Sequence, residues 1–200
     1  VGISMVADLK EKGYNVLATG EMGIGNTTTS SAVCSVLLDQ SVEKVTGKGA
    51  GLTNKDLEHK IEVIRQSIAL NKVNADDPLD VLAKVGGLDI AGMAGCYIGG
   101  AALNIPVFID GFISSVAALI AIRLVPECAP YLFPSHCSNE PAGRMILDAI
   151  GKQPYILANM CLGEGTGAVM GFTIADYAFK AYWELPSFEQ TNFGTYEELN

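Results

Sequence analysis

The sequence has few cysteines, few histidines and few basic residues, and each shortage excludes a class of protein. Five cysteines in 200 residues are too few, and odd in number, for a secreted fold held together by disulfides. They form no Cys-x-x-Cys pair, and only His59 and His136 could join them, so we expect no metal site. Thirteen basic residues against 22 acidic ones leave a net charge of −9, which argues against nucleic acid as a partner.

A long uninterrupted hydrophobic run is also lacking. The most apolar stretch, residues 105–125, contains Asp110, Ser114 and Arg123, so it does not qualify as a membrane-spanning helix. We expect a buried strand followed by a buried helix there instead. The first residues show no targeting segment, and we therefore expect a cytoplasmic protein.

What the sequence does contain is an alternation of short apolar strands with longer helical patterns. Apolar runs at 14–18, 106–111 and 131–133 are separated by segments with helical spacing. This order predicts an α/β fold: a Rossmann-like, three-layer domain with a mainly parallel sheet flanked by helices. We expect residues 1–185 to form this domain, and residues 186–200 to form a tail that docks on it.

The 22 glycines are clustered, and four glycine-rich or polar segments each follow an apolar run: 20–28, 46–51, 135–140 and 163–167. In parallel α/β sheets, ligands bind at the carboxyl ends of the strands. We therefore expect the apolar runs before these segments, including residues 157–162, to be strands, and the four segments to converge on one crevice.

The segment 20–28 has the character of an anion site. Glycines let backbone amides face a ligand, the following helix adds its positive N-terminal end, and Thr27 and Thr28 add hydroxyl groups. It is neither a Walker loop nor a G-x-G-x-x-G fingerprint. A simple glycine turn with a capping residue is the alternative interpretation.

The segment 47–51 is a second candidate phosphate loop, because Lys48 lies in it and Lys60 lies on the helix that follows. The alternative is an ordinary loop with solvated lysines. Thr53 and Asp56 have the spacing of a capping box at the start of that helix.

Three acids are candidates for chemistry: Glu21 and Glu164 inside glycine loops, and Asp110 at a strand end. An acid so placed can serve as a general base, whereas a helix cap or a loop hydrogen bond is the alternative. His136 next to Ser135 suggests a hydrolase, but the G-x-S-x-G elbow is lacking, so a polar binding loop is the preferred interpretation.

Five motifs, in order along nearly the whole chain, resemble those of the nicotinate-nucleotide–dimethylbenzimidazole phosphoribosyltransferase family. They are Gly20–Thr28, Gly47–Leu52 with Lys60-Ile61, Phe108–Phe112, Ser135–Pro141 and Leu162–Ala168.

The resemblance implies transfer of the phosphoribosyl group of nicotinate mononucleotide to dimethylbenzimidazole, giving α-ribazole phosphate and nicotinate, a step in assembling the lower ligand of cobalamin. It implies Glu164 as general base with Glu21 beside it, no cofactor, and a homodimer. The binding residues expected in addition are Gly23, Ile24, Gly25, Asn26, Thr27, Thr28, Gly49, Lys60, Asp110, Ser138, Leu162, Gly163 and Gly165.

Chains of that family are longer at the N-terminus, so we expect this chain to be the catalytic large domain with part of the acceptor pocket absent. A truncated module that binds the nucleotide without turnover is the alternative. A Rossmann oxidoreductase is disfavoured by the missing third glycine.

Overall fold

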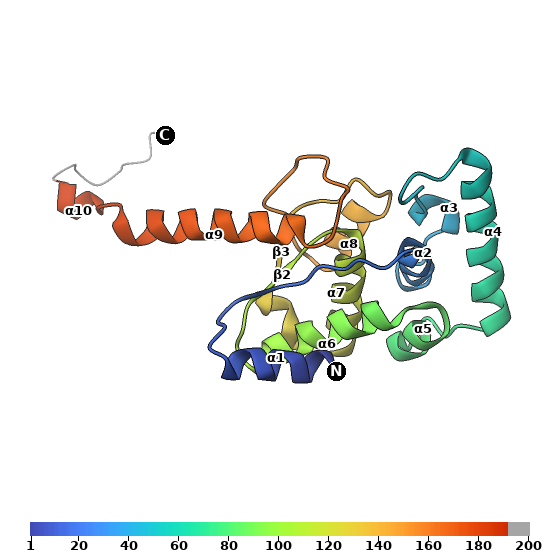
Figure 1. The fold of residues 1–200 in the computed structure, drawn as a ribbon, viewed down its shortest axis with the longest axis horizontal. Helices are drawn as coiled ribbons and strands as arrows, with labels where there is room; N and C mark the ends of the chain where they lie inside the picture. Colours follow the sequence, from blue (N-terminus) through green and yellow to red (C-terminus); the bar gives the residue numbers. More distant parts are fainter. Residues whose placement is uncertain (192–200) are drawn as a thin grey trace, which may run out of the picture.

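The computed structural model describes residues 1–191, and it contains a parallel sheet between helical layers (Figure 1). The strand order is β1 (Leu17–Ala18), β2 (Val107–Ile109) and β3 (Leu132–Pro134). Leu17 pairs with Val107, and Val107 pairs with Leu132. All three strands run parallel, so their carboxyl ends lie along one edge of the sheet, as the α/β prediction requires.

Helices make up most of the remaining structure. They are α1 (Gly2–Glu11), α2 (Asn26–Leu37), α3 (Val42–Val45), α4 (Asn54–Asn71), α5 (Pro78–Val85), α6 (Leu88–Ala102), α7 (Phe112–Leu124), the 3-10 helix η1 (Pro126–Tyr131), α8 (Gly143–Ala149), α9 (Thr166–Glu184) and α10 (Phe188–Thr191).

Helices α6 and α9 cover opposite faces of the central strand. Adjacent side chains of a strand point to opposite faces, and Val107 packs against Gly100 of α6 while Phe108 packs against Gly171 of α9. Phe108 also meets the ring of Phe172 edge-on, with centroids 5.0 Å apart. The two helices accordingly lie on either side of the sheet in Figure 1.

The predicted strand–helix unit at 105–125 is confirmed, because β2 and most of α7 are buried. Three of the four glycines of α6 pack closely, which offsets the cost of glycine in a helix. A Cβ built on Gly95 would lie 3.1 Å from the Cα of Gly2, and one on Gly99 would lie 3.0 Å from the Cα of Ile3. These glycines let α1 approach α6.

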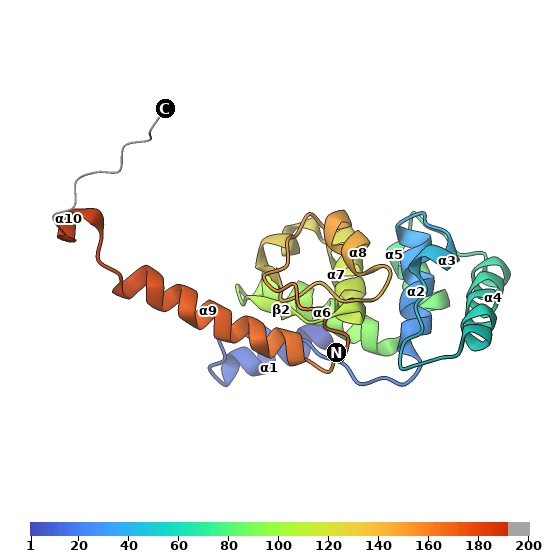
Figure 2. The same cartoon turned by 90° about the horizontal axis from the view of Figure 1, so that it is seen from above.

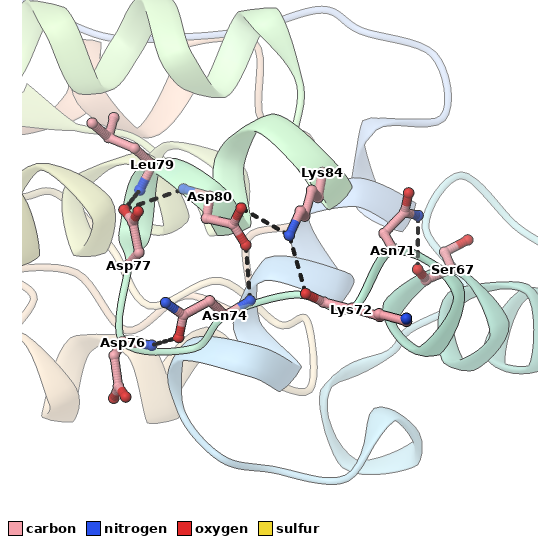
Figure 3. A network of polar contacts seen from close by, with 9 residues as sticks. All are labelled: Ser67, Asn71, Lys72, Asn74, Asp76, Asp77, Leu79, Asp80 and Lys84. Carbon is pink, nitrogen blue, oxygen red and sulfur yellow. Dashed lines mark hydrogen bonds and ion pairs between the residues drawn. The ribbon is translucent and has the colours of Figure 1, made fainter.

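Helices α2 to α5 form a group to one side of the sheet (Figures 1 and 2). The connection from α4 to α5 is held by polar contacts (Figure 3). Asp77 caps α5 by accepting from the amide of Leu79 at 2.9 Å. Asp80 accepts from the amide of Asn74 at 2.8 Å and pairs with Lys84 at 2.9 Å, and these interactions lower its pKa.

Three expectations are corrected. The first strand is shorter than predicted and only partly buried, with Tyr14 and Val16 exposed. Residues 157–162 form no strand, and Leu157 and Leu162 are exposed, so the loop 163–167 does not follow a strand. The segment 46–51 follows the short helix α3 rather than a strand. Apolar composition was the only signal for these strands, and it does not distinguish a strand from a loop.

The C-terminal tail also differs from expectation over the residues described. Helix α9 projects outward from the sheet, and α10 lies at its outer end, away from the body (Figures 1 and 2). Residues 185–190 are exposed, so the predicted docking is wrong for this part of the tail. The remainder of the tail, residues 192–200, lies outside the described residues.

Candidate active site

A cavity of about 310 Å³ lies at the carboxyl ends of the strands. All four predicted segments contribute to it, as expected: residues 21–27 follow β1, Gly49 and Ala50 come from the loop before α4, His136 and Ser138 follow β3, and Gly163 and Glu164 precede α9. Asp110 and the first turn of α7 complete the wall from β2. Loops separated by more than a hundred residues therefore face one space.

The loop after β1 is tied together by the Glu21 carboxylate. Its Oε2 accepts from the amide of Gly23 at 3.1 Å and from the side-chain amide of Asn26. Asn26 also donates to Asp89 at 2.9 Å. Gly25, with φ of 91°, forms the N-cap of α2 in the left-handed region that favours glycine. No side chain caps α2, and its first residues, Asn26 and Thr27, line the cavity, so the positive end of the helix lies at a place that suits an anion.

The loop 163–167, which carries Glu164, is anchored by Asp110, a residue that is 1% exposed. One carboxylate oxygen accepts from the amide of Gly165 at 2.9 Å. The other accepts from the amides of Gly167 at 2.8 Å and Ala168 at 3.2 Å. A carboxylate is well suited to the N-terminal end of a helix, where four amides lack intrahelical partners. Asp110 thus fixes the start of α9.

This anchor determines the placement of Glu164. Gly163, Glu164 and Gly165 have φ values of 75°, 58° and 82°, so three consecutive residues are left-handed. For a residue with a side chain this conformation costs about 1–2 kcal/mol, and neighbouring contacts must stabilise it. Thr166 helps by donating to the carbonyl of Gly163 at 2.7 Å.

The two glutamate loops touch through their glycines. A Cβ built on Gly20 would lie 2.6 Å from both the amide nitrogen and the Cα of Gly165, so only a glycine permits this approach. Glu21 and Glu164, the neighbours of these glycines, both line the cavity and a second, more open hollow beside it. The structure therefore places both predicted catalytic acids at one place.

Lys60 supports the cavity from behind rather than lining it. Its ammonium group donates to Thr27 Oγ1 at 2.9 Å and to the carbonyl of Gly47 at 3.0 Å, and the residue is 7% exposed. Burial lowers its pKa. Glu140 faces it from the opposite loop. Burial raises the pKa of Glu140, and the charge of Lys60 lowers it in part. Lys60 joins the loop 47–51 to α2.

His136 is a further buried polar residue of the cavity wall, 2% exposed. Its backbone pairs with Ile156 in an isolated parallel bridge. Its ring lies against the backbone of Gly167, where an added Cβ would collide with Nδ1. Burial lowers the pKa of His136, and nearby Asp110 partly opposes this shift.

Most of the expected residues lie on the cavity, and three do not. Thr28 and Lys60 do not line it, and Gly165 lines only the second hollow. Met22, Ala50, Gly111 and Phe112 also line the cavity; they lie inside the predicted motifs, although they were not named as binding residues. Sequence reasoning missed Ile113, Ser114 and Cys161, and their position shortly after Asp110 was the available signal for the first two.

Residues 1–191 lack two features that would change this picture of the site. No group of three or more His, Cys, Asp or Glu side chains is arranged to hold a metal ion there. No helix in the described part of the chain is both long and apolar enough to cross a membrane.

Comparisons with known proteins identify the family. A family model described as phosphoribosyltransferase matches residues 1–193. The nicotinate-nucleotide–dimethylbenzimidazole phosphoribosyltransferase of Ruminiclostridium cellulolyticum is 54% identical over 198 residues, which are 99% of this chain and 56% of that protein. The protein of the same name from Acetivibrio thermocellus is 50% identical over 197 residues, covering 98% and 56%.

The fold has close counterparts among solved structures. The crystal structure of CobT from Thermus thermophilus matches with a TM-score of 0.90 at 32% identity, over 96% of this chain and 57% of that one. The chain spans little more than half the length of the relatives it matches. On its sequence, its fold and the match over residues 1–193, the chain belongs to the nicotinate-nucleotide–dimethylbenzimidazole phosphoribosyltransferase family.

Proposed function

We propose that this chain carries the site that transfers the phosphoribosyl group of nicotinate mononucleotide to dimethylbenzimidazole. The products are α-ribazole phosphate, used in cobalamin lower-ligand assembly, and nicotinate. The observation that carries the proposal is the meeting of Glu21 and Glu164 on a cavity whose other walls are glycine turns and a helix N-terminus. Two carboxylates beside an anion site suit proton removal next to a phosphorylated sugar.

The chemistry needs one displacement. One nitrogen of the azole attacks C1′ of the ribose, the bond from C1′ to the pyridinium nitrogen breaks, and Glu164 takes the proton from the other azole nitrogen. The electron pair of the broken bond leaves with nicotinate, and attack from the opposite face turns the β linkage into an α linkage. As the bond to the leaving group stretches, positive charge grows on the sugar, and the two carboxylates stabilise it.

The remaining residues bind and orient. We assign the 5′-phosphate to the part of the cavity lined by Ile24, Gly25 and the start of α2, with Gly49 beside Thr27. Holding the phosphate at one end of the cavity fixes the line along which the azole approaches C1′. Glu21 already binds Gly23 and Asn26 through one oxygen, so we assign it an orienting role.

The proposal extends to a homodimer, which the resemblance implies, and to action in the cytoplasm. Its support is the apolar surface of α9, where Tyr177, Phe179, Tyr182 and Trp183 are each more than 60% exposed. A surface of this kind suits protein–protein contact. There are two candidates to cover this surface: a second copy of the chain, or the additional residues that the longer relatives have.

The test is release of nicotinate from nicotinate mononucleotide, followed by chromatography, with and without dimethylbenzimidazole. We expect azole-dependent release that falls by about 10²–10⁴-fold in Glu164→Gln. Glu184→Gln, at the outer end of the same helix, is the matched control and should keep full activity. The full-length Ruminiclostridium cellulolyticum relative serves as the positive control for the assay.

Nucleotide binding without release, while the full-length relative is active, would favour the truncated binding module. Absence of both binding and release would contradict the proposed function of this chain.

A further inference from the structure

The hydrogen bonds around Ser135 determine which nitrogen of His136 carries the proton. Ser135 Oγ lies 2.8 Å from the carbonyl oxygen of Ile109, 3.2 Å from that of Asp110 and 3.1 Å from His136 Nδ1. Carbonyl oxygens can only accept, so the single hydroxyl proton of Ser135 is donated to a carbonyl. Placing this proton on the shorter contact, that to Ile109, makes His136 Nδ1 the donor to Ser135 Oγ and leaves Nε2 as an unprotonated acceptor.

Nε2 faces the cavity. It has no hydrogen-bond partner among residues 1–191, although His136 is 2% exposed. Nε2 is nevertheless not completely enclosed by protein. Among the described residues, the side-chain atoms that are fully enclosed and lack a hydrogen-bond partner are Ser30 Oγ, Thr46 Oγ1 and Glu140 Oε2. A Cβ built on Gly111, another cavity residue, would lie 3.4 Å from Nε2. The free nitrogen is therefore reached from the cavity and not from bulk solvent.

Protonation does not remove this acceptor near neutral pH. Burial lowers the pKa of His136 from its ordinary value of 6.5. The groups that face the ring are the Asp110 carboxylate, which partly opposes the shift, the Ser135 hydroxyl and the backbone of Gly167. The imidazole is held neutral with its lone pair directed into the site.

We infer that His136 Nε2 accepts a hydrogen bond from a ribose hydroxyl of the phosphoribosyl donor. The inference rests on the proposed function and adds a substrate-binding residue to it. An acceptor needs a donor, and in nicotinate mononucleotide the phosphate and the carboxylate are themselves acceptors, which leaves the 2′ and 3′ hydroxyls. The azole offers one N–H, whose proton the proposed mechanism gives to Glu164. The sugar joins the phosphate to the base, and His136 lines the same cavity as the start of α2 and Glu164.

The experiment compares two amide substitutions. In His136→Asn, the side-chain amide can replace Nδ1–H toward Ser135, but no atom reaches the position of Nε2. In His136→Gln, the longer side chain can return an oxygen to that position. We measure binding of nicotinate mononucleotide and of its 2′-deoxy and 3′-deoxy analogues by titration calorimetry, and unfolding temperature for each variant.

We expect His136→Asn to bind nicotinate mononucleotide roughly three- to tenfold more weakly, the size of one neutral hydrogen bond. His136→Gln should recover part of this loss. One of the two deoxy analogues should bind to wild type more weakly than nicotinate mononucleotide does, by the same factor. The same analogue and nicotinate mononucleotide should bind to His136→Asn with equal affinity. The hydroxyl that this analogue lacks is the one that donates to Nε2.

Three results overturn the inference while leaving the proposed function intact. The first is equal affinity of wild type and a folded His136→Asn for the nucleotide. The second, which needs no variant, is wild type binding both deoxy analogues as tightly as the parent. The third is a loss in His136→Asn that depends on the azole and not on the ribose hydroxyls. Failure of wild type to bind the nucleotide at all would remove the proposed function, and this inference with it.

Discussion

Gly20 and Gly165 meet backbone to backbone, and this contact brings the two glutamate loops together. The space between them is too small for any side chain, since a Cβ on Gly20 would lie 2.6 Å from the Gly165 amide nitrogen. The contact ties the end of β1 to the N-cap of α9, two elements far apart in the sequence. The relative position of Glu21 and Glu164 depends on it.

Gly20→Ala should therefore separate the two acids. We expect nicotinate release to fall by at least about tenfold, because misplacement of catalytic groups by about an ångström is costly. Gly92→Ala is the matched control, because nothing lies within 4 Å of a Cβ at that position of α6. It should keep activity and raise the free energy of unfolding by up to about 1 kcal/mol. Equal activity of the two variants would show that the contact is unimportant.

Asp110 acts as the anchor of α9, and its removal should affect stability as well as turnover. Asp110→Ala leaves the amides of Gly165, Gly167 and Ala168 without their acceptor, at a cost of about 1–3 kcal/mol in the free energy of unfolding. Denaturant unfolding measures this loss. Asp148→Ala, which removes an exposed pair with Arg144, should cost clearly less. Similar losses for both variants would contradict the anchoring role.

Lys60 should be needed to order the loop before α4. Lys60→Met keeps the aliphatic stem and removes the hydrogen bonds to Thr27 and Gly47, so amide hydrogen exchange in residues 47–51 should speed up. Lys48→Met changes an exposed lysine of the same loop and should leave exchange unchanged. Unchanged exchange in both variants would argue that Lys60 does not order this loop.

The lowered pKa of His136 predicts a loss of stability in acid. The unfolded chain takes up the proton near pH 6.5, whereas the folded chain does so only at lower pH, so acidification from 6.5 downward favours unfolding. Between pH 7.5 and 5.5, the unfolding temperature of wild type should fall by more than that of His136→Asn. Parallel pH dependences would show that His136 titrates normally.

Local patterns in the chain were enough to specify the type and order of most elements. A buried strand followed by a buried helix was predicted within 105–125, where β2 and α7 are found. Thr53 caps α4 by accepting from the amide of Asp56 at 3.2 Å, as its spacing indicated. These features depend on neighbours within a few residues, so the residues themselves encode them. The glycine loops also identified the cavity, because glycines without a helical or strand pattern mark close approaches of the backbone.

The tasks of individual side chains, by contrast, became visible only in the folded arrangement. In sequence, Asp110 has the same appearance as a ligand-binding acid, and Lys60 that of a phosphate-binding lysine. The fold shows Asp110 bonded to three amides of α9 and Lys60 bonded to Thr27 and Gly47. Likewise, the free nitrogen of His136 follows from Ser135 facing two carbonyls of a neighbouring strand end. Such roles depend on partners that long-range packing supplies, and no local pattern in the chain encodes them.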